Sequence, residues 1–364
     1  MNKVKLKDVC EAMASNIAQK DISVGNGDYP IYGASGFIGN VDFYKQEKPY
    51  IGIVKDGAGV GRAYLLPEKS SVIGTMQYIL PKDNIDIKYL YYAIQYMHLE
   101  KYYSGATIPH IYFRDYQYEP ILLPGKKEQE QKTNGLEKID KLVFKHKKTL
   151  RIIDTLVKSR FIEMFGDPVT NPMGWKVTTV GQVTTDVRYG TSAKANDDGQ
   201  YKYLRMNNLT YDGYLDLSDL KHIDVSDDEL EKCVVRKGDV LFNRTNSTEL
   251  VGKTALFDLD EDMVIAGYII RVRLHEFVSP VFFTRFMNME FMKKQLRSMA
   301  KGAVNQANIN AQELKAIAMY VPPIELQNEF ADFVEQVDKS KFAVQQSINT
   351  LQTLKAKLMQ AYFK

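Results

Sequence analysis

The sequence has few cysteines and few long apolar runs, and both absences limit the class of this 364-residue chain. Its two cysteines, Cys10 and Cys233, lie far apart and have no Cys or His nearby. This spacing excludes a disulfide framework and a Cys/His zinc cluster, and it favours a reducing, cytoplasmic location. No run of about 18 apolar residues could span a membrane, and the N-terminus lacks the apolar stretch of a signal peptide. We therefore expect a soluble protein that is not exported.

Motifs of the common enzyme classes are also missing. The sequence contains no Walker A motif, no HExxH and no GxSxG. The segment Asn171-Pro-Met-Gly lacks the aromatic residue that an amino-methyltransferase tetrad requires. The glycine-rich segment 56–62 lacks GxGxxG spacing and precedes no helical pattern, so it predicts a turn between two strands. The five histidines show no metal-ligand spacing, and we expect neither catalysis nor a bound metal in this chain.

The sequence also has no strong excess of charge of one sign. There are 48 Lys and Arg residues against 45 Asp and Glu, a net charge of +3. A nucleic-acid-binding protein usually carries a basic surface, and this balance excludes a uniformly basic one. The surplus lies in residues 121–167, which hold 11 basic and 7 acidic residues. Such a run on a helix is commonly a solvated face, and contact with phosphates is the alternative.

The chain contains an internal duplication. Residues 111–160 and 309–358 align at a constant shift of 198, which places Gln129 on Gln327 and Asp140 on Asp338. In each copy, short β-branched and aromatic runs separated by Gly, Asn and Asp precede a long stretch with apolar residues every three or four positions. The sequence therefore predicts mixed α/β modules over 1–124 and 167–322, and long helices over 125–166 and 323–364.

Both helices are predicted to begin after a proline, in LLPGKKEQEQ and VPPIELQNEF, and the first to run from Lys126 to Glu163. Apolar spacings of three and four sustained over several turns are typical of a coiled-coil seam. We expect the helices to pair antiparallel and to form a rigid spacer; the alternative is that each packs on its own module. The predicted fold class is α+β, with two mixed α/β modules joined by two long antiparallel coiled-coil helices in a pseudo-twofold internal repeat.

Candidate binding residues gather in predicted loops of both modules. Arg and Asn side chains can bond base edges, while Lys and Ser suit phosphates, so the loops favour a nucleic-acid interface. The candidates in the first module are Tyr32, Ser35, Lys55, Arg62, His110 and Tyr112. Those in the second module are Arg188, Tyr189, Lys194, Arg205, Asn207, Asn208, Arg244, Thr245, Asn246, Lys253, Asn305 and Gln306. For any single tyrosine, a place in the core is the alternative.

Three features together resemble the specificity subunit of type I restriction-modification systems. They are the junction 160–175 (RFIEMFGDPVTNPMGW), the segment from Lys237-Gly-Asp to Val251-Gly-Lys253, and the Pro-then-Gln starts of both helices. The resemblance spans essentially the whole chain. It implies two target-recognition domains, each followed by a long helix, that recognise a split, asymmetric sequence in double-stranded DNA, with the helices setting the distance between the two half-sites.

The resemblance also implies that this chain is not catalytic and binds no cofactor. Two modification subunits would methylate adenine with S-adenosylmethionine, and restriction subunits would use ATP and Mg²⁺. The first module departs from the family pattern, because it lacks the Lys-Gly-Asp segment and has residues 55–62 where Val251-Gly-Lys253 falls in the second.

The alternative function is a coiled-coil adaptor whose modules bind other proteins. The near-neutral modules predict weak DNA binding by the isolated chain.

Overall fold

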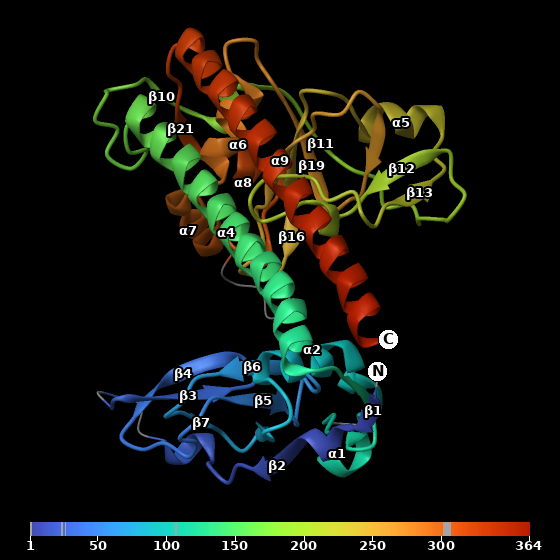
Figure 1. Ribbon diagram of the computed structural model, residues 1–364. Helices are drawn as coiled ribbons and strands as arrows, with labels where there is room; N and C mark the ends of the chain where they lie inside the picture. The colour runs from blue at the N-terminus through green and yellow to red at the C-terminus, as the bar shows by residue number, and fades with distance from the viewer. Residues whose placement is uncertain (1, 23–24, 26, 106–107, 301–306) are drawn as a thin grey trace. The chain divides into compact units, whose positions relative to one another are not determined.

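The computed structural model describes residues 2–22, 25, 27–105, 108–300 and 307–364 and falls into two compact units. Unit 1 comprises Met1–Lys148 and Gln345–Lys364, and unit 2 comprises Thr149–Val344. The long helices are α4 (Lys126–Phe165) and α9 (Ile324–Phe363), and each unit contains a stretch of both (Figure 1). The units therefore do not coincide with the four segments expected from the sequence. No helix in the described ranges is long and apolar enough to cross a membrane.

Unit 1 is built on two sheets, with strand orders β2-β8-β5-β6 and β4-β3-β7. A separate pair joins β1 to β9. The strands are β1 (Asn2–Lys5), β2 (Cys10–Ala14), β3 (Tyr29–Gly33), β4 (Gly36–Val41), β5 (Tyr50–Val54), β6 (Ala63–Leu66), β7 (Ser71–Val72), β8 (Met76–Pro81) and β9 (Pro120–Leu123). The helices are α1 (Leu6–Val9), α2 (Ile87–Met97) and α3 (Phe113–Tyr116), with short 3-10 turns η1 (Gln19–Asp21) and η2 (Leu99–Tyr102).

Unit 2 contains four-stranded sheets of order β11-β19-β15-β17 and β13-β12-β18-β14, and the pairs β10-β21 and β16-β20. The strands are β10 (Val177–Thr179), β11 (Thr184–Tyr189), β12 (Tyr201–Leu204), β13 (Lys221–Ile223), β14 (Val234–Val235), β15 (Val240–Asn243), β16 (Thr245–Asn246), β17 (Thr254–Leu256), β18 (Met263–Ile265), β19 (Ile269–Leu274), β20 (Ala307–Asn308) and β21 (Ala318–Tyr320). The helices are α5 (Asp227–Cys233), α6 (Pro280–Met287), α7 (Glu290–Met299) and α8 (Ala311–Ala316), with 3-10 turns η3 (Val180–Gln182) and η4 (Met206–Asn208).

The two units share one topology. The sheet β2-β8-β5-β6 corresponds to β11-β19-β15-β17, and β4-β3-β7 corresponds to β13-β12-β18. Even the parallel pairs match, since β3 runs parallel to β7 and β12 runs parallel to β18. Single hydrogen bonds also recur: Ile111 N donates to Lys55 O, and Ile309 N donates to Arg244 O, both at 2.9 Å. The internal repeat predicted from the sequence is therefore confirmed.

The Pro-then-Gln start ties each long helix to its own module. In unit 1 the buried Gln129 donates from Nε2 to Pro124 O at 2.8 Å and accepts from Asp86 N at 2.7 Å. In unit 2 Gln327 donates to the carbonyl of the equivalent proline at 2.7 Å and accepts from Ser279 N at 2.8 Å. Asp86 and Ser279 are the N-cap residues of α2 and α6. One glutamine thus links the first turn of a long helix to the first turn of a module helix.

The aligned aspartates of the two helices also have matching contacts. Tyr92 of α2 donates its hydroxyl to Asp140 at 2.9 Å. Tyr214 donates its hydroxyl to Asp338 at 2.7 Å. Each module therefore holds its long helix at a second point, about three turns beyond the glutamine.

Segments of α4 and α9 lie side by side within each unit (Figure 1). The polar contacts between them are Asp140–Lys355 at 2.6 Å and His146–Ser347 at 3.3 Å in unit 1, and Asp154–Lys341 at 2.6 Å and Arg160–Glu329 at 3.2 Å in unit 2. In both units, contacts further along α4 are made to residues earlier in α9, so the two helical segments run antiparallel. Predicted seam residues buried here include Leu136, Val157, Phe330, Val334 and Ile348.

Candidate nucleic-acid interface

Predicted site residues gather at two equivalent hairpins. The hairpin of unit 1 joins β5 to β6, and the hairpin of unit 2 joins β15 to β17. Val54, the last residue of β5, donates its backbone N–H to Arg62 O at 2.9 Å. Asn243, the last residue of β15, donates its backbone N–H to Lys253 O at 2.8 Å. Arg62 and Lys253 are therefore structurally equivalent, as are Lys55 and Arg244. This confirms the predicted alignment of residues 55–62 with the segment that ends in Val251-Gly-Lys253.

In unit 1 the chain leading to α3 lies beside the hairpin. Asp56 and His110 form an antiparallel bridge, and Ile111 N bonds Lys55 O. The His110 and Tyr112 rings meet edge to face, with centroids 5.1 Å apart. The Lys55 amine lies 3.3 Å from the Asp56 carboxylate. The fold therefore brings Lys55 close to His110 and Tyr112, although Lys55 is more than 50 residues away from both in the sequence.

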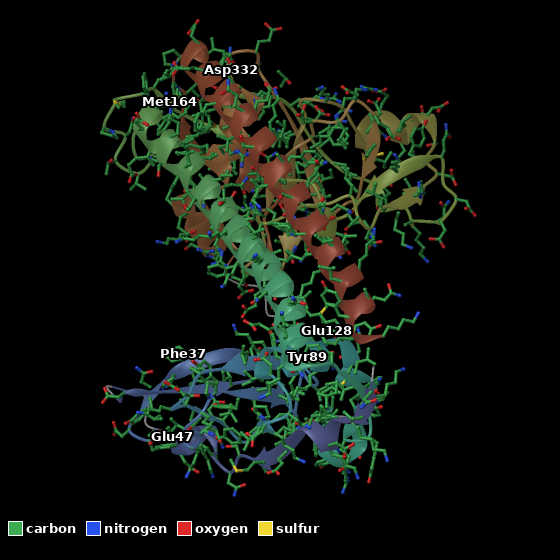
Figure 2. The ribbon with its side chains drawn as sticks, in the orientation of Figure 1. Phe37, Glu47, Tyr89, Glu128, Met164 and Asp332 are labelled. Atoms are coloured by element: carbon green, nitrogen blue, oxygen red, sulfur yellow. The ribbon has the colours of Figure 1, made fainter. Side chains whose placement is uncertain are left out.

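The β3–β4 hairpin supplies the remaining candidates of unit 1. Ser35 is exposed at its turn, and Tyr32 is half-buried against Phe37, with ring centroids 5.9 Å apart. Burial raises the pKa of Tyr32. Arg62 approaches this hairpin through Tyr64, whose hydroxyl accepts from Arg62 at 3.3 Å and donates to a hairpin carbonyl at 2.8 Å. Phe37 was not predicted as a site residue, yet it is 62% exposed (Figure 2).

In unit 2 two of the candidate residues, Arg244 and Tyr189, form a cation–aromatic pair. The Arg244 guanidinium lies 4.7 Å from the centre of the Tyr189 ring. The Tyr189 hydroxyl accepts from Ala311 N at 2.9 Å, at the start of α8. Asn246 is half-buried beside them and donates to the Asn243 side chain at 2.8 Å.

Three candidates of unit 2 are buried and use their polar atoms inside the unit. Lys253 is 7% exposed, and its Nζ donates to Met206 O at 2.9 Å and Leu209 O at 2.6 Å. Burial lowers the pKa of this amine. Asn208 is 2% exposed and donates to two carbonyls of the following loop. Thr245, also 7% exposed, donates to the Asn308 side chain at 3.1 Å. Because these polar groups are buried and already bonded within the unit, we do not include Asn208, Thr245 and Lys253 in the candidate interface.

The other candidates of unit 2 are scattered around it. Arg188 is paired with Asp186 at 2.9 Å, and Arg205 is paired with Asp219 at 2.8 Å. The side chains of Lys194 and Asn207 are exposed. Asn305 and Gln306 lie outside the described residues.

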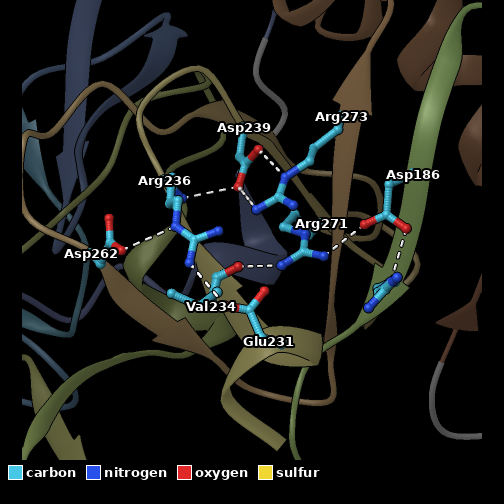
Figure 3. A network of polar contacts seen from close by, with 9 residues as sticks. Asp186, Glu231, Val234, Arg236, Asp239, Asp262, Arg271 and Arg273 are labelled. Atoms are coloured by element: carbon cyan, nitrogen blue, oxygen red, sulfur yellow. Dashed lines mark hydrogen bonds and ion pairs between the residues drawn. The ribbon is translucent and has the colours of Figure 1, made fainter. Parts of the chain in front are cut away.

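The Lys-Gly-Asp motif of unit 2 shapes the entry to β15. Gly238 has φ +94°, a conformation that L side chains rarely adopt, so glycine is required there. The Asp239 carboxylate accepts from Arg236 N at 2.9 Å and pairs with Arg273 at 2.9 Å (Figure 3). The motif thus fixes a turn and one strand end rather than contacting a ligand.

A buried arginine completes this network. Arg271 is fully buried on β19, pairs with Asp186 at 2.6 Å and donates to the Val234 carbonyl (Figure 3). Although burial raises the pKa of Asp186, hydrogen bonds from Arg271 and Arg188 hold it below its usual value. Sequence reasoning missed Arg271. The available signal was its place between apolar residues in Ile269-Ile-Arg-Val-Arg-Leu274.

Neither a metal nor a reactive thiol is suggested by the described residues. They contain no group of three His, Cys, Asp or Glu side chains that could hold a metal ion. Cys10 and Cys233 are buried and unpaired. Burial raises the pKa of the Cys10 thiol to about 12, which suppresses thiolate chemistry.

The chain is similar to several type I specificity subunits. It is 26% identical over 196 residues to the putative type I restriction enzyme MjaX specificity subunit of Methanocaldococcus jannaschii, covering 53% of this chain and 46% of that protein. It is 26% identical over 171 residues to the EcoKI specificity subunit of Escherichia coli K12, covering 46% and 37%. The alignments thus span less than half the length of these two relatives. The MjaVIII specificity subunit of M. jannaschii is 23% identical over 306 residues, covering 78% and 71%.

Solved structures share the fold across the whole chain. The S subunit of a type I restriction-modification system from M. genitalium matches with a TM-score of 0.64 at 15% identity, covering 100% of this chain and 96% of that one. A chain from a study of complex assembly and conformational transition of the type I R-M system matches with a TM-score of 0.55 at 15% identity, covering 99% and 97%. Residues 1–153 and 172–354 match the family described as the type I restriction modification DNA specificity domain. The chain therefore belongs to this family.

Proposed function

We propose that this chain is the DNA-specificity subunit of a type I restriction-modification complex and that each unit recognises one half of a bipartite, asymmetric DNA site. The observation that carries the proposal is that the two units share the same backbone fold but have different side chains at equivalent hairpin positions. Lys55 of unit 1 occupies the position of Arg244 in unit 2, and the exposed Arg62 of unit 1 occupies the position of Lys253, which is buried in unit 2. Equivalent hairpins with different chemistry suit two half-sites of different sequence, because base edges are distinguished by donor and acceptor pattern.

Helix α4 contributes sequence-independent contacts in this proposal. Lys138, Lys141 and Lys148 are exposed and have no carboxylate partner among the described residues. On α9 the positions equivalent to Lys138 and Lys148 are Gln336 and Gln346, so the repeated helix forms without these charges. Lysines that the fold does not need are available to neutralise DNA phosphates, which orient a protein on DNA without conveying sequence.

The partners in this proposal are two modification subunits and the restriction subunits of the same system, acting on DNA in the cytoplasm. S-adenosylmethionine, ATP and Mg²⁺ would be bound by those subunits, and this chain would supply recognition. Exposed apolar side chains on the long helices support protein docking there: Phe144 is 70% exposed and Phe342 is 65% exposed. Neighbouring apolar residues left in water, such as Ile152 and Leu156 one turn apart on α4, are typical of a surface that a partner covers.

The test is to purify the chain with its modification subunits and to map the adenines that the complex methylates. We expect one bipartite motif, and protection of that site in a footprint. A complex that binds and methylates DNA without sequence preference would contradict the proposal. An assembly that forms without any DNA binding would instead favour the adaptor function.

A further inference from the structure

Arginine side chains in unit 2 are almost all neutralised by carboxylates. Those in ion pairs are Arg160, Arg188, Arg205, Arg236, Arg271, Arg273, Arg285 and Arg297. Among the described arginines of unit 2, only Arg151 and Arg244 have no carboxylate partner. Arg151 is exposed on α4, whereas Arg244 lies in the hairpin that joins β15 to β17.

Arg244 is nevertheless held in one position. Its backbone N donates to Tyr268 O at 3.0 Å, and its carbonyl accepts from Ile309 N at 2.9 Å. The guanidinium stacks over Tyr189 at 4.7 Å, and Nη1 donates weakly to Gly267 O at 3.4 Å. Nε is buried, so the donors left for an external acceptor are those of Nη1 and Nη2. A guanidinium packed against an aromatic ring and without a carboxylate partner can bind an acceptor from outside the unit.

The equivalent hairpin of unit 1 also has an arginine beside a tyrosine, but at its other end, at the position that Lys253 occupies in unit 2. Its arginine is Arg62, which is exposed and has no carboxylate partner within the described part of unit 1. Arg62 is positioned by Tyr64, whose hydroxyl accepts from Nη1 at 3.3 Å. The other arginine of the module, Arg114, lies 3.5 Å from the Asp115 carboxylate. Each hairpin thus has one arginine whose guanidinium contacts a tyrosine and forms no ion pair with a described carboxylate.

We propose that Arg244 and Arg62 each recognise a guanine, one in each half-site. The inference rests on the proposed function and deepens it by naming the base. A planar guanidinium presents two parallel N–H donors that match O6 and N7 of guanine in the major groove. A lysine can also reach these two acceptors, but its flexible ammonium lacks the fixed planar fork of the guanidinium. The Tyr189 ring restricts the Arg244 guanidinium, and the Tyr64 hydroxyl restricts that of Arg62, before DNA arrives.

A phosphate group has acceptors with similar geometry, so the experiment must separate base from backbone. We would purify the complex of the chain with its modification subunits as wild type, Arg244→Lys and Arg62→Lys. Binding would be measured on the methylated site and on duplexes changed at each base pair in turn. Arg297→Lys is the matched control, because Arg297 also contacts a tyrosine, Tyr211, but is paired with Glu290.

Arg244→Lys should reduce discrimination at one G·C pair, by at most the roughly 5- to 150-fold expected for a complete bidentate contact, and only in the half-site of unit 2. Arg62→Lys should do the same in the other half-site, and Arg297→Lys should change neither. Equal weakening on every sequence, with a smaller salt dependence, would identify a phosphate contact and overturn the inference. Unchanged discrimination in both variants would overturn it as well.

A second measurement needs no variant and therefore does not depend on folding. Replacing each guanine of the site by 7-deazaguanine removes the N7 acceptor while pairing is kept. Wild-type binding should weaken at one guanine in each half-site, and a site tolerant of every such replacement would contradict the inference. A wild-type complex without sequence preference would refute the proposed function itself, whereas a specific complex insensitive to these changes would refute only the role of the two arginines.

Discussion

Replacing Gln327 by Leu should destabilise unit 2 strongly, because one buried side chain makes three hydrogen bonds there. Gln327 is fully buried, donates to Pro322 O at 2.7 Å and Phe277 O at 3.2 Å, and accepts from Ser279 N at 2.8 Å. Leucine has a similar volume and leaves these groups without a partner. A buried polar group that loses its partner costs about 1–3 kcal/mol. Since Phe277 is half-exposed and water can reach it, two groups remain without a partner, and we expect a loss of about 2–6 kcal/mol.

The single tryptophan makes the assay specific for this unit. Trp175 lies in unit 2, where its indole N–H donates to Phe165 O at 2.8 Å, so its fluorescence in urea reports the unfolding of that unit. Gln129→Leu removes the equivalent anchor of unit 1 and is the matched control. Gln327→Leu should lower the fluorescence midpoint and Gln129→Leu should leave it nearly unchanged. Equal midpoints for wild type and Gln327→Leu would refute the anchoring role.

Three further predictions concern pH, backbone conformation and salt. Burial lowers the pKa of Lys293 from 10.5 to about 8, so between these values the unfolded state binds more protons. The free energy of unfolding should therefore rise from pH 8 to pH 10 in wild type but not in Lys293→Met, which urea titrations would compare. Gly238→Ala should cost about 1–2 kcal/mol in a thermal melt, because φ is +94° and no atom lies within 4 Å of the added Cβ; an unchanged melt would refute the strain. Replacing Lys138, Lys141 and Lys148 by Gln should reduce the slope of log affinity against log salt by about 0.9 for each DNA phosphate that is no longer neutralised. An unchanged slope would remove α4 from the DNA interface.

Features that depend on local pattern could be predicted from the sequence. Apolar spacing and a preceding proline predicted helices close to Lys126–Phe165 and Ile324–Phe363. The constant shift between Gln129 and Gln327 predicted a repeat that the structure extends to single hydrogen bonds. The glycine-rich segment 56–62 was predicted to be a strand connection, and it joins β5 to β6. The helices and the strand connection are indicated by a few neighbouring residues, whereas the repeat is indicated by two stretches that match at a constant shift.

Side-chain burial could not be predicted, because it depends on distant parts of the chain. Lys253 looked like a phosphate contact, yet the carbonyls of Met206 and Leu209 enclose its amine. Arg271 was not predicted to have a structural role, although Asp186, 85 residues away, pairs with it in the interior. Residue type indicates what a side chain can bond, whereas only the fold decides whether the partner is a carbonyl of the same unit or a molecule outside it.

The central claim is that each unit recognises its own half of one DNA site. The most direct measurement exchanges residues 167–322 for the corresponding module of another family member and maps methylated adenines across the genome of cells that also express the modification subunits. One half of the bipartite motif should change, while the half assigned to unit 1 and the distance between the halves stay the same. A change in both halves, or a single uninterrupted motif before and after the exchange, would contradict the account.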